Sequence, residues 1–470
     1  MEIIPSPDER EDSRPVRSFS AVEEFIKSES AGAILLLIAT IFALIWANSS
    51  YSASYFAFWS YPIGWNVGGV SFATDLHHCI NDGLMSLFFF VVGLEIKRET
   101  KKGELSSTGR AALPAIAALG GMLVPAAIYF LLNRHGETAR GWAIPMATDI
   151  GFAIGVLGLL GKRIPSSLRI FLLALAIVDD VGAILVIALF YTDYISAGAI
   201  GVAFGLLVVL FVLSRRVPKT AIFSIFGVAF WVAILMSGVH ATIAGVILGL
   251  VTPLKPQYEA SEMISRARRL LDKFHFALQD RQDETAEVTL RELQALAHGT
   301  ESMGERLEES LHPWVSFMIL PLFALANAGV ALSISELGAA MRSQSAIGIF
   351  LGLVVGKIIG VVGFSFLAVK FRFATMAEDT NWHHFIGAGM LAGIGFTVAL
   401  FVSTLAFEND ELESTAKIAI MIASLVSGVL GYIYLRLTYR FARRQETNRG
   451  RTRSPRPFSH RARCCGRARG

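Results

Sequence analysis

The chain is a succession of long apolar runs separated by short polar segments. A transmembrane helix needs about 17–25 mainly apolar residues to cross the hydrocarbon layer. Twelve runs reach or approach this length, and the boundary between the seventh and the eighth is the least defined. The pattern predicts an all-α polytopic membrane protein with about twelve transmembrane helices. The runs are residues 31–48, 76–96, 112–133, 142–160, 167–191, 196–213, 220–236, 238–252, 312–333, 346–369, 383–406 and 415–437.

The polar segments divide the chain further. Residues 1–30 begin with a polar, proline-containing stretch, so the first apolar run starts too late for a typical cleaved signal peptide. Residues 31–252 hold the first eight predicted helices and residues 312–437 the last four. The tail, residues 438–470, is rich in arginine and is predicted to be disordered and cytoplasmic.

Residues 253–311 form the only sizeable polar insert between apolar runs. The apolar residues of its first part follow a 3-4-3-4 spacing, which predicts an amphipathic helix, and a weaker stretch covers 288–296. We interpret the insert as a packed or solvated cytoplasmic linker, with a regulatory partner site as the alternative. The spaced residues are Ile264, Ala267, Leu271, Phe274 and Leu278.

Basic residues indicate the orientation, because cytoplasmic loops of membrane proteins carry an excess of Lys and Arg. With a cytoplasmic N-terminus, twelve basic residues fall in inside loops and three in outside loops, with Lys417 close to a helix start. Both termini are therefore predicted to be cytoplasmic. The inside residues are Lys97, Arg98, Lys101, Lys102, Arg110, Lys162, Arg163, Arg215, Arg216, Lys219, Lys370 and Arg372, and the outside residues are Arg134, Arg140 and Arg342.

Composition excludes several classes of protein. With 53% hydrophobic and 17% charged residues, the chain is too apolar for a single soluble core. The net charge of +4 comes largely from the tail and does not indicate nucleic acid as a partner. Cys79, Cys464 and Cys465 show neither metal-ligand spacing nor a disulfide framework, so redox chemistry and a cofactor are not expected.

Two trios of apolar runs have the same layout: residues 112–191 in the first half and 346–437 in the second. The middle member of each trio is interrupted, in "AIPMATDIGFAIG" by proline and glycine and in "GAGMLAGIGFTVALF" by four glycines. Interrupted segments in corresponding positions indicate inverted-topology repeats whose broken helices cross at the membrane midplane. The sequence therefore predicts two broken, crossing helices.

Asp179 and Asp180 stand side by side in the otherwise apolar run "RIFLLALAIVDDVGAILVIALFY". Each carboxylate costs about 2.5–3.5 kcal/mol at a helix centre, whereas each Leu, Ile, Val or Phe contributes about 0.3–0.6 kcal/mol in favour of insertion. Residues 170–190 contain fourteen residues of those four types, so the helix can insert with both acids. An acid pair that an ordinary anchor would lack indicates a site for a mobile positive ion.

Two further ionisable residues fall near mid-depth: Asp149, beside the predicted break, and Lys357. Asp149 could offset the positive helix ends at the crossing, and Lys357 the negative ones. Lys357 could instead pair with Asp179 and release it when a cation arrives. Carboxylate oxygens suit Na⁺ or Li⁺ and also bind protons, so competition for one site would produce exchange, and Thr148 could add a hydroxyl oxygen.

Six segments together closely resemble the NhaA-type sodium/proton antiporters of bacterial inner membranes. They are "MATDIGFAIGVL", "ALAIVDDVGAI", "SGVHATIAGVI", "LHPWVSFMILPLFALANAGV", "GKIIGV" and "GIGFTVALF". The resemblance implies electrogenic export of Na⁺ or Li⁺ driven by inward proton flow, stimulated at alkaline pH, and a homodimer. It implies that Asp180 is the principal cation ligand, and that Asp179, Lys357, Asp149 and Thr148 match the family's other site residues.

The resemblance also implies a cytoplasmic pH-response cluster. Its residues here would be Glu95, Arg98 and Glu99 in "GLEIKRE", with Glu308 and His312 around "LHPW". Without the resemblance, these residues read as a solvated, charge-paired helix end. Glu309 stands where some members carry a second histidine, so the pH set point of this chain could differ. His240 matches another family position but could equally be a packing residue.

The function expected from these observations is that of a secondary antiporter in the bacterial inner membrane, not an enzyme. A cation channel is the main alternative, although it would need a continuous polar pore, whereas the polar groups here concentrate at one depth. A membrane-bound pH or ion sensor is the weaker third interpretation, motivated by the charged cluster and the insert.

Overall fold

The computed structural model describes residues 29–452, apart from 68–69, 193–194, 217–219, 256–259, 281–282, 299–300, 332–337, 339 and 341. Every predicted apolar run contains helix. Within the described residues, eight helices are long and apolar enough to cross a membrane, two further pairs of helices are bent at a break, and two shorter apolar helices complete the set. The protein is thus an all-α polytopic membrane protein, as predicted.

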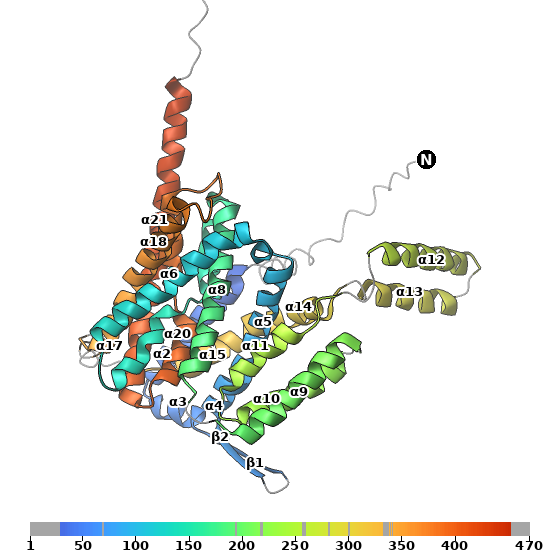
Figure 1. Cartoon of the computed structure of the whole chain (residues 1–470), viewed down its shortest axis with the longest axis horizontal. Helices are drawn as coiled ribbons and strands as arrows, with labels where there is room; N and C mark the ends of the chain where they lie inside the picture. Colours follow the sequence, from blue (N-terminus) through green and yellow to red (C-terminus); the bar gives the residue numbers. More distant parts are fainter. Residues whose placement is uncertain are drawn as a thin grey trace, which may run out of the picture.

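The first half runs from α2 to α11 (Figure 1). Its elements are α2 (Glu29–Ala47), α3 (Ser52–Trp59), β1 (Pro62–Val67), β2 (Val70–Asp75), α4 (Leu76–His78), the π-helical turn η2 (Cys79–Leu84), α5 (Met85–Lys101), η3 (Glu104–Ser106), α6 (Thr108–Leu132), the 3₁₀ helix η4 (Glu137–Met146), α7 (Ile150–Leu160), η5 (Gly161–Arg163), α8 (Ser166–Phe190), α9 (Ala197–Arg216), α10 (Thr220–Leu235) and α11 (Ala241–Val251).

The second half runs from α12 to α21 (Figure 1). Its elements are α12 (Ala260–Gln279), α13 (Asp283–His298), α14 (Met303–Trp314), the π-helical turn η6 (Val315–Ile319), α15 (Leu320–Asn327), α17 (Gln344–Leu351), the π-helical turn η7 (Gly352–Gly356), α18 (Lys357–Lys370), α19 (Trp382–Ala392), α20 (Phe396–Ala406) and α21 (Asp410–Thr452).

The seventh and eighth predicted runs become the short helices α10 and α11, of 16 and 11 residues. At 1.5 Å per residue they extend over about 24 and 17 Å, less than the ~30 Å hydrocarbon layer. The chain turns between them at Gly238, whose φ of 82° lies in the left-handed region that favours glycine. This turn explains why the boundary was hard to place from hydropathy.

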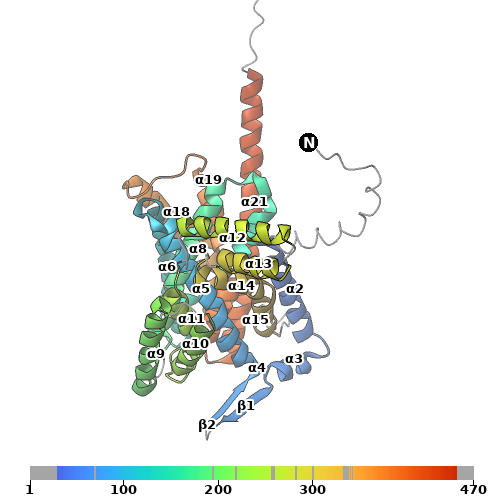
Figure 2. The ribbon, with the colours of Figure 1, turned by 90° about the vertical axis from the view of Figure 1, so that its right-hand side faces the viewer.

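A two-stranded antiparallel sheet was not predicted. β1 pairs with β2 from Pro62↔Asp75 to Val67↔Val70, and the hairpin projects from one end of the bundle (Figure 2). Apolar residues alternate along the segment, as in Ile63, Trp65 and Val67, and a Gly-Gly dipeptide follows. These are hairpin signals, but they are short and lie between much stronger helical runs.

The predicted insert contains two helices, α12 and α13, which pack against each other and stand apart from the bundle (Figure 1). The next helix, α14, begins at Met303, nine residues before the predicted run that starts at 312. Its start is fixed by a capping box, in which Ser302 and Glu305 each satisfy the other's backbone N–H. The continuous span ends at Asn327 rather than at residue 333.

The C-terminal helix is longer than predicted. α21 continues to Thr452 and rises well beyond the bundle, whereas disorder was expected from residue 438 (Figure 2). Arg, Ala, Gln and Glu are good helix formers, and no proline occurs between 438 and 452 to end the helix. The rest of the predicted tail, 453–470, and residues 1–28 of the predicted N-terminal segment lie outside the described residues.

Candidate functional site

The two predicted broken helices meet at their breaks. The first changes from η4 to α7 through an extended stretch at Ala147–Asp149, and the second bends by 45° between α19 and α20. The backbone N–H of Asp149 donates to the carbonyl oxygen of Ile394 at 2.7 Å, and the hydroxyl of Thr148 donates to that of Ala392 at 2.9 Å. These bonds hold the two breaks directly against each other.

Asp149 lies between two helix N-termini. One carboxylate oxygen accepts the N–H of Phe152 in the first turn of α7 at 2.9 Å. The other accepts the N–H of Thr397 at 3.1 Å and its hydroxyl at 2.5 Å, in the first turn of α20. A carboxylate at an N-terminus stabilises the unpaired N–H groups and the positive end of the helix dipole. Asp149 therefore offsets two such ends at once, and its oxygens are both satisfied.

Lys357 is fully buried and uses all three of its ammonium hydrogens. It donates to Asp179 Oδ2 at 2.7 Å, to Thr148 Oγ1 at 2.9 Å and to the carbonyl oxygen of Met146. Met146 is the last residue of η4, so the ammonium group faces the negative end of that helix. The π-helical turn η7 directly precedes Lys357, and π-helical turns occur frequently at functional sites.

Asp180 differs from its neighbour in having no hydrogen-bond partner in the part of the chain that the structure describes. Its side chain is 2% exposed, and neither of its carboxylate oxygens accepts a hydrogen bond from any described residue. Asp179 Oδ1 is likewise buried without a hydrogen bond from the described part of the chain. Neighbouring side chains on a helix point about 100° apart, so the two acids face different surroundings. Three buried carboxylate oxygens thus remain open to a cation or a proton, next to a lysine that already balances one acid.

A family model described as Na⁺/H⁺ antiporter 1 matches residues 23–435. The chain belongs to this antiporter family. It is 46% identical to the Na⁺/H⁺ antiporter NhaA of Koribacter versatilis over 87% of this chain and 90% of the relative. Its identity to NhaA of Syntrophobacter fumaroxidans is 44%, over 89% and 90% of the two chains, and its identity to NhaA 2 of Sorangium cellulosum is 46%, over 90% and 91%.

The antiporter brings most of the predicted pH-response residues together at one end of α5 and α14. Arg98 forms an ion pair with Glu308 and lies 3.8 Å from Glu99. Glu99 also accepts the backbone N–H of Glu104 at 3.0 Å. Glu308 is buried, and the Arg98 guanidinium beside it supplies the opposite charge that a buried carboxylate needs.

Two other members of the predicted cluster extend it in different directions. Glu95, one turn before Glu99 on α5, interacts electrostatically with both Glu308 and Asp180. His312 follows Glu308 by one turn of α14 and is exposed at the surface.

The structure separates His240 from the predicted pH-response cluster. His240 precedes α11, and its Nε2 lies 2.7 Å from the carbonyl oxygen of Tyr191. The cluster is near the other end of α11, where Lys97 donates to the carbonyl oxygen of Thr252 at 2.5 Å. His240 therefore lies at the opposite end of α11 from Arg98 and Glu308, and its role in the pH response stays a prediction.

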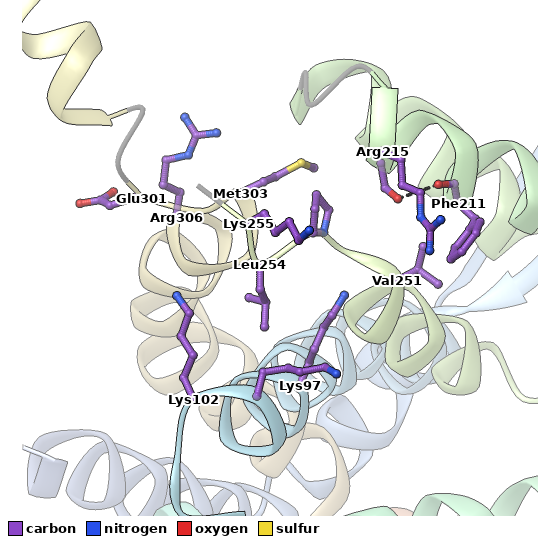
Figure 3. Close-up of a pocket in the computed structure, with 13 residues that line it drawn as sticks. Lys97, Lys102, Phe211, Arg215, Val251, Leu254, Lys255, Glu301, Met303 and Arg306 are labelled. Carbon is purple, nitrogen blue, oxygen red and sulfur yellow. Dashed lines mark hydrogen bonds between the residues drawn. The ribbon is translucent and has the colours of Figure 1, made fainter. Parts of the chain in front are cut away.

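The antiporter carries a basic cavity of about 980 Å³ beside the pH-response residues, at the ends of α5, α9, α11 and α14. Figure 3 shows Lys97 and Lys102 on one side, Arg215 on another and Arg306 above. The lining contains one acid among the described residues, Glu301. The cavity is distinct from the acid-pair site and gathers positive charge at one end of the bundle. Its basic lining residues are Lys97, Lys101, Lys102, Arg215, Lys255 and Arg306.

Sequence reasoning missed Thr397 and the carbonyl of Met146. Thr397 follows the second break in "GIGFTV", so a hydroxyl in the first turn of a half-helix was a usable signal. No sequence signal pointed to the Met146 carbonyl, because its role depends on a hydrogen bond from Lys357, which lies 211 residues away in the sequence.

Proposed function

We propose that the antiporter exports Na⁺ or Li⁺ through direct competition between the cation and protons for Asp180 and Asp179. The observation that carries this proposal is that both oxygens of Asp180 and one of Asp179 are buried without a hydrogen bond from the described residues. A buried carboxylate without a partner is costly unless it binds a proton or a cation. Hard monovalent cations and protons both bind carboxylate oxygen, so one site serves both ions with no covalent step.

Lys357 balances the acid pair when no cation is bound. Its ammonium group pairs with Asp179 and anchors to Thr148 and Met146. We infer that an entering cation replaces the ammonium group at Asp179 and that the freed lysine or the acids exchange protons. Export coupled to inward proton flow is then electrogenic when more protons than cations cross in each cycle. In this scheme Thr148 anchors Lys357 and can also offer its oxygen to the cation.

A cation channel is less well supported by the geometry. Asp179, Asp180 and Lys357 are each at most 2% exposed, and the two breaks are hydrogen-bonded to each other. A closed site at the crossing suits alternating access, in which one group of helices moves against another.

Everted membrane vesicles with an imposed proton gradient test the assignment. Addition of Na⁺ should dissipate the gradient in the natural chain, and Asp180→Asn should abolish this response. Asp272→Asn removes the same charge from an exposed position on α12 and should exchange normally. Exchange retained in Asp180→Asn would refute the site, and Na⁺ current without proton movement would favour the channel.

We further propose that the protein lies in the inner membrane with both termini cytoplasmic. The basic cavity and the Lys-rich end of α5 lie at one end of the bundle, whereas the β1–β2 hairpin lies at the other (Figure 2). The positive-inside rule supports a cytoplasmic position for the basic end. A homodimer stays an expectation of the family resemblance.

A reporter fusion tests this orientation. A fluorescent protein that matures only in the cytoplasm, fused after residue 470, should fluoresce in intact cells. A dark fusion of a chain shown to be full-length and membrane-inserted would reverse the orientation.

The cluster around Arg98 and Glu308 is proposed to set the pH response. Glu95 supports this role because it interacts electrostatically with both Glu308 and Asp180. Glu308→Gln should shift the pH at which exchange begins in the vesicle assay, and an unchanged pH profile would remove the cluster from regulation.

A further inference from the structure

We propose that Asp75, His77 and His78 form a binding site for a divalent transition-metal ion of the zinc class. The three residues lie where β2 ends and α4 begins, at the hairpin end of the bundle (Figure 2). One ligand atom from each residue lies within 4.8 Å of the other two. Two imidazoles and a carboxylate are a donor set that zinc sites use, with water completing the coordination.

The backbone already holds two of the donors together. Asp75 caps α4 by accepting the N–H of His78 at 2.7 Å. The same carboxylate oxygen lies 2.7 Å from His78 Nδ1. Two ligand atoms at about 2.0–2.2 Å from a tetrahedral zinc ion are about 3.4 Å apart. The 2.7 Å pair therefore needs a shift of less than about 1 Å for an ion to replace the proton between its two atoms.

The hydrogen-bond network selects the tautomer of neutral His77 that can bind a metal. The side-chain nitrogen of Asn327 donates to the carbonyl oxygen of Phe323 at 3.0 Å and to Asn81 Oδ1 at 2.9 Å. Asn327 Oδ1 must therefore be the atom that faces His77 Nε2, at 2.9 Å. Because this oxygen only accepts, Nε2 carries the hydrogen and Nδ1 of the neutral ring keeps its lone pair.

This arrangement matches the surroundings of metal-binding histidines. Such histidines generally donate their second ring N–H to a carbonyl or carboxylate oxygen, which orients the ring and increases its basicity as a ligand. Asn327 supplies that acceptor from α15, and Asn81 in turn holds Asn327. The side chains of His78 and Asp75 are 66% and 32% exposed, so an ion from solution can reach the site.

Titration of the purified full-length protein, prepared without a polyhistidine tag, tests the proposal. Zn²⁺ should bind with one ion per chain by calorimetry, and Co²⁺ should give an absorption spectrum of nitrogen and oxygen ligation. His78→Ala should abolish Zn²⁺ binding, and because this side chain is exposed, the change should not disturb the fold. Asp75→Asn should weaken Zn²⁺ binding. His135→Ala changes a histidine in an exposed segment elsewhere and should bind Zn²⁺ like the natural chain.

Cys79 needs its own control because it is an exposed free cysteine next to His78. Cys79→Ser should retain the bound ion. Loss of binding in Cys79→Ser with retention in His78→Ala would overturn the proposal in favour of a thiol site. Absence of saturable Zn²⁺ binding in the natural chain would also overturn it. None of these outcomes depends on antiport, so the metal site and the acid-pair site are tested separately.

Discussion

At the scale of single residues, two buried charged groups of the site have complete hydrogen bonds, whereas Asp180 has none from the described residues. Lys357 uses three hydrogens, and Asp149 accepts from two helix ends. Asp180 is just as deeply buried and accepts no hydrogen bond from the described residues. Satisfied groups hold the crossing in one geometry, whereas the unsatisfied acid is the one that gains most from a bound ion.

Lys357→Ala tests the compensation at the acid pair. Removing one partner of a buried ion pair leaves an uncompensated charge, which typically costs about 3–5 kcal/mol of folding stability. We expect a lower thermal unfolding midpoint for the purified protein, together with a weaker or pH-shifted electrogenic current on solid-supported membranes.

Adding Asp179→Asn to Lys357→Ala removes the carboxylate that has lost its ion-pair partner. The double variant should recover part of the lost folding stability. Lys370→Ala, at the other end of α18, is the matched control and should leave the current unchanged. A natural pH profile and midpoint in Lys357→Ala would exclude the proposed role of the lysine.

Thr397→Val tests the role of Asp149 at the crossing. Valine has nearly the same shape as threonine but cannot donate to the carboxylate, which now accepts the hydroxyl at 2.5 Å. Hydrogen bonds to charged groups contribute about 1.5–3 kcal/mol, and we expect thermal unfolding to show a loss of stability of that size. Thr404→Val on the same helix removes only a bond to the local carbonyl of Phe401 and should have a smaller effect. Equal effects of the two changes would contradict the special role of Thr397.

At the scale of elements, the breaks and close contacts matter more than helix length. Gly120 on α6 and Gly360 on α18 bring the two backbones together, because a Cβ on Gly120 would clash with the carbonyl oxygen of Gly360. Only glycine permits this approach, which membrane helices use for tight packing. α18 also carries Lys357, so the contact with α6 helps to position the ammonium group.

Gly120→Ala should therefore destabilise the protein and displace α18. The added methyl group would meet the backbone of Gly360 and the ring of Phe364, and backbone cannot move aside as a flexible side chain can. We expect a lower unfolding midpoint and reduced antiport in vesicles.

Gly363→Ala provides the matched control on α18, because nothing among the described residues lies within 4 Å of a Cβ at that position. It should be neutral or slightly stabilising, since alanine favours helix over glycine by about 1 kcal/mol. If both changes were equally harmless, the close contact between α6 and α18 would not govern packing.

The same scale explains what sequence could and could not predict. The apolar runs and the mid-depth charges were predictable, because the cost of inserting each residue is local to its own helix. The paired breaks were also visible as proline and glycine in corresponding runs. The bond from Thr397 to Asp149 was not predictable, because 248 residues separate the two side chains. The hairpin is local, but its short signals lie between much stronger helical runs.

At the scale of the whole molecule, α12 and α13 form a unit apart from the bundle (Figure 1). The two helices bury Ala277, Thr289 and Leu296, and Lys273 lies 3.5 Å from Glu292 between them. The chain leaves and re-enters the bundle at almost the same place, since the N–H of Gly304 donates to the carbonyl oxygen of Pro253 at 3.1 Å. The two ends of the insert are therefore held together by the bundle itself, without help from α12 and α13.

Replacing residues 256–300 by a short Gly-Ser linker tests whether this unit takes part in transport. The close approach of Pro253 and Gly304 lets a short flexible connection span the gap without strain. The ion site lies at the crossing of the broken helices, and the hydrogen bonds of Lys357 there come from Met146, Thr148 and Asp179, not from α12 or α13. We expect everted vesicles to show Na⁺-induced dissipation of the proton gradient at a rate comparable to that of the natural chain. Loss of exchange in a variant that is still folded would make the insert part of the transport unit, whereas a shifted pH threshold with normal maximal rate would assign it to regulation.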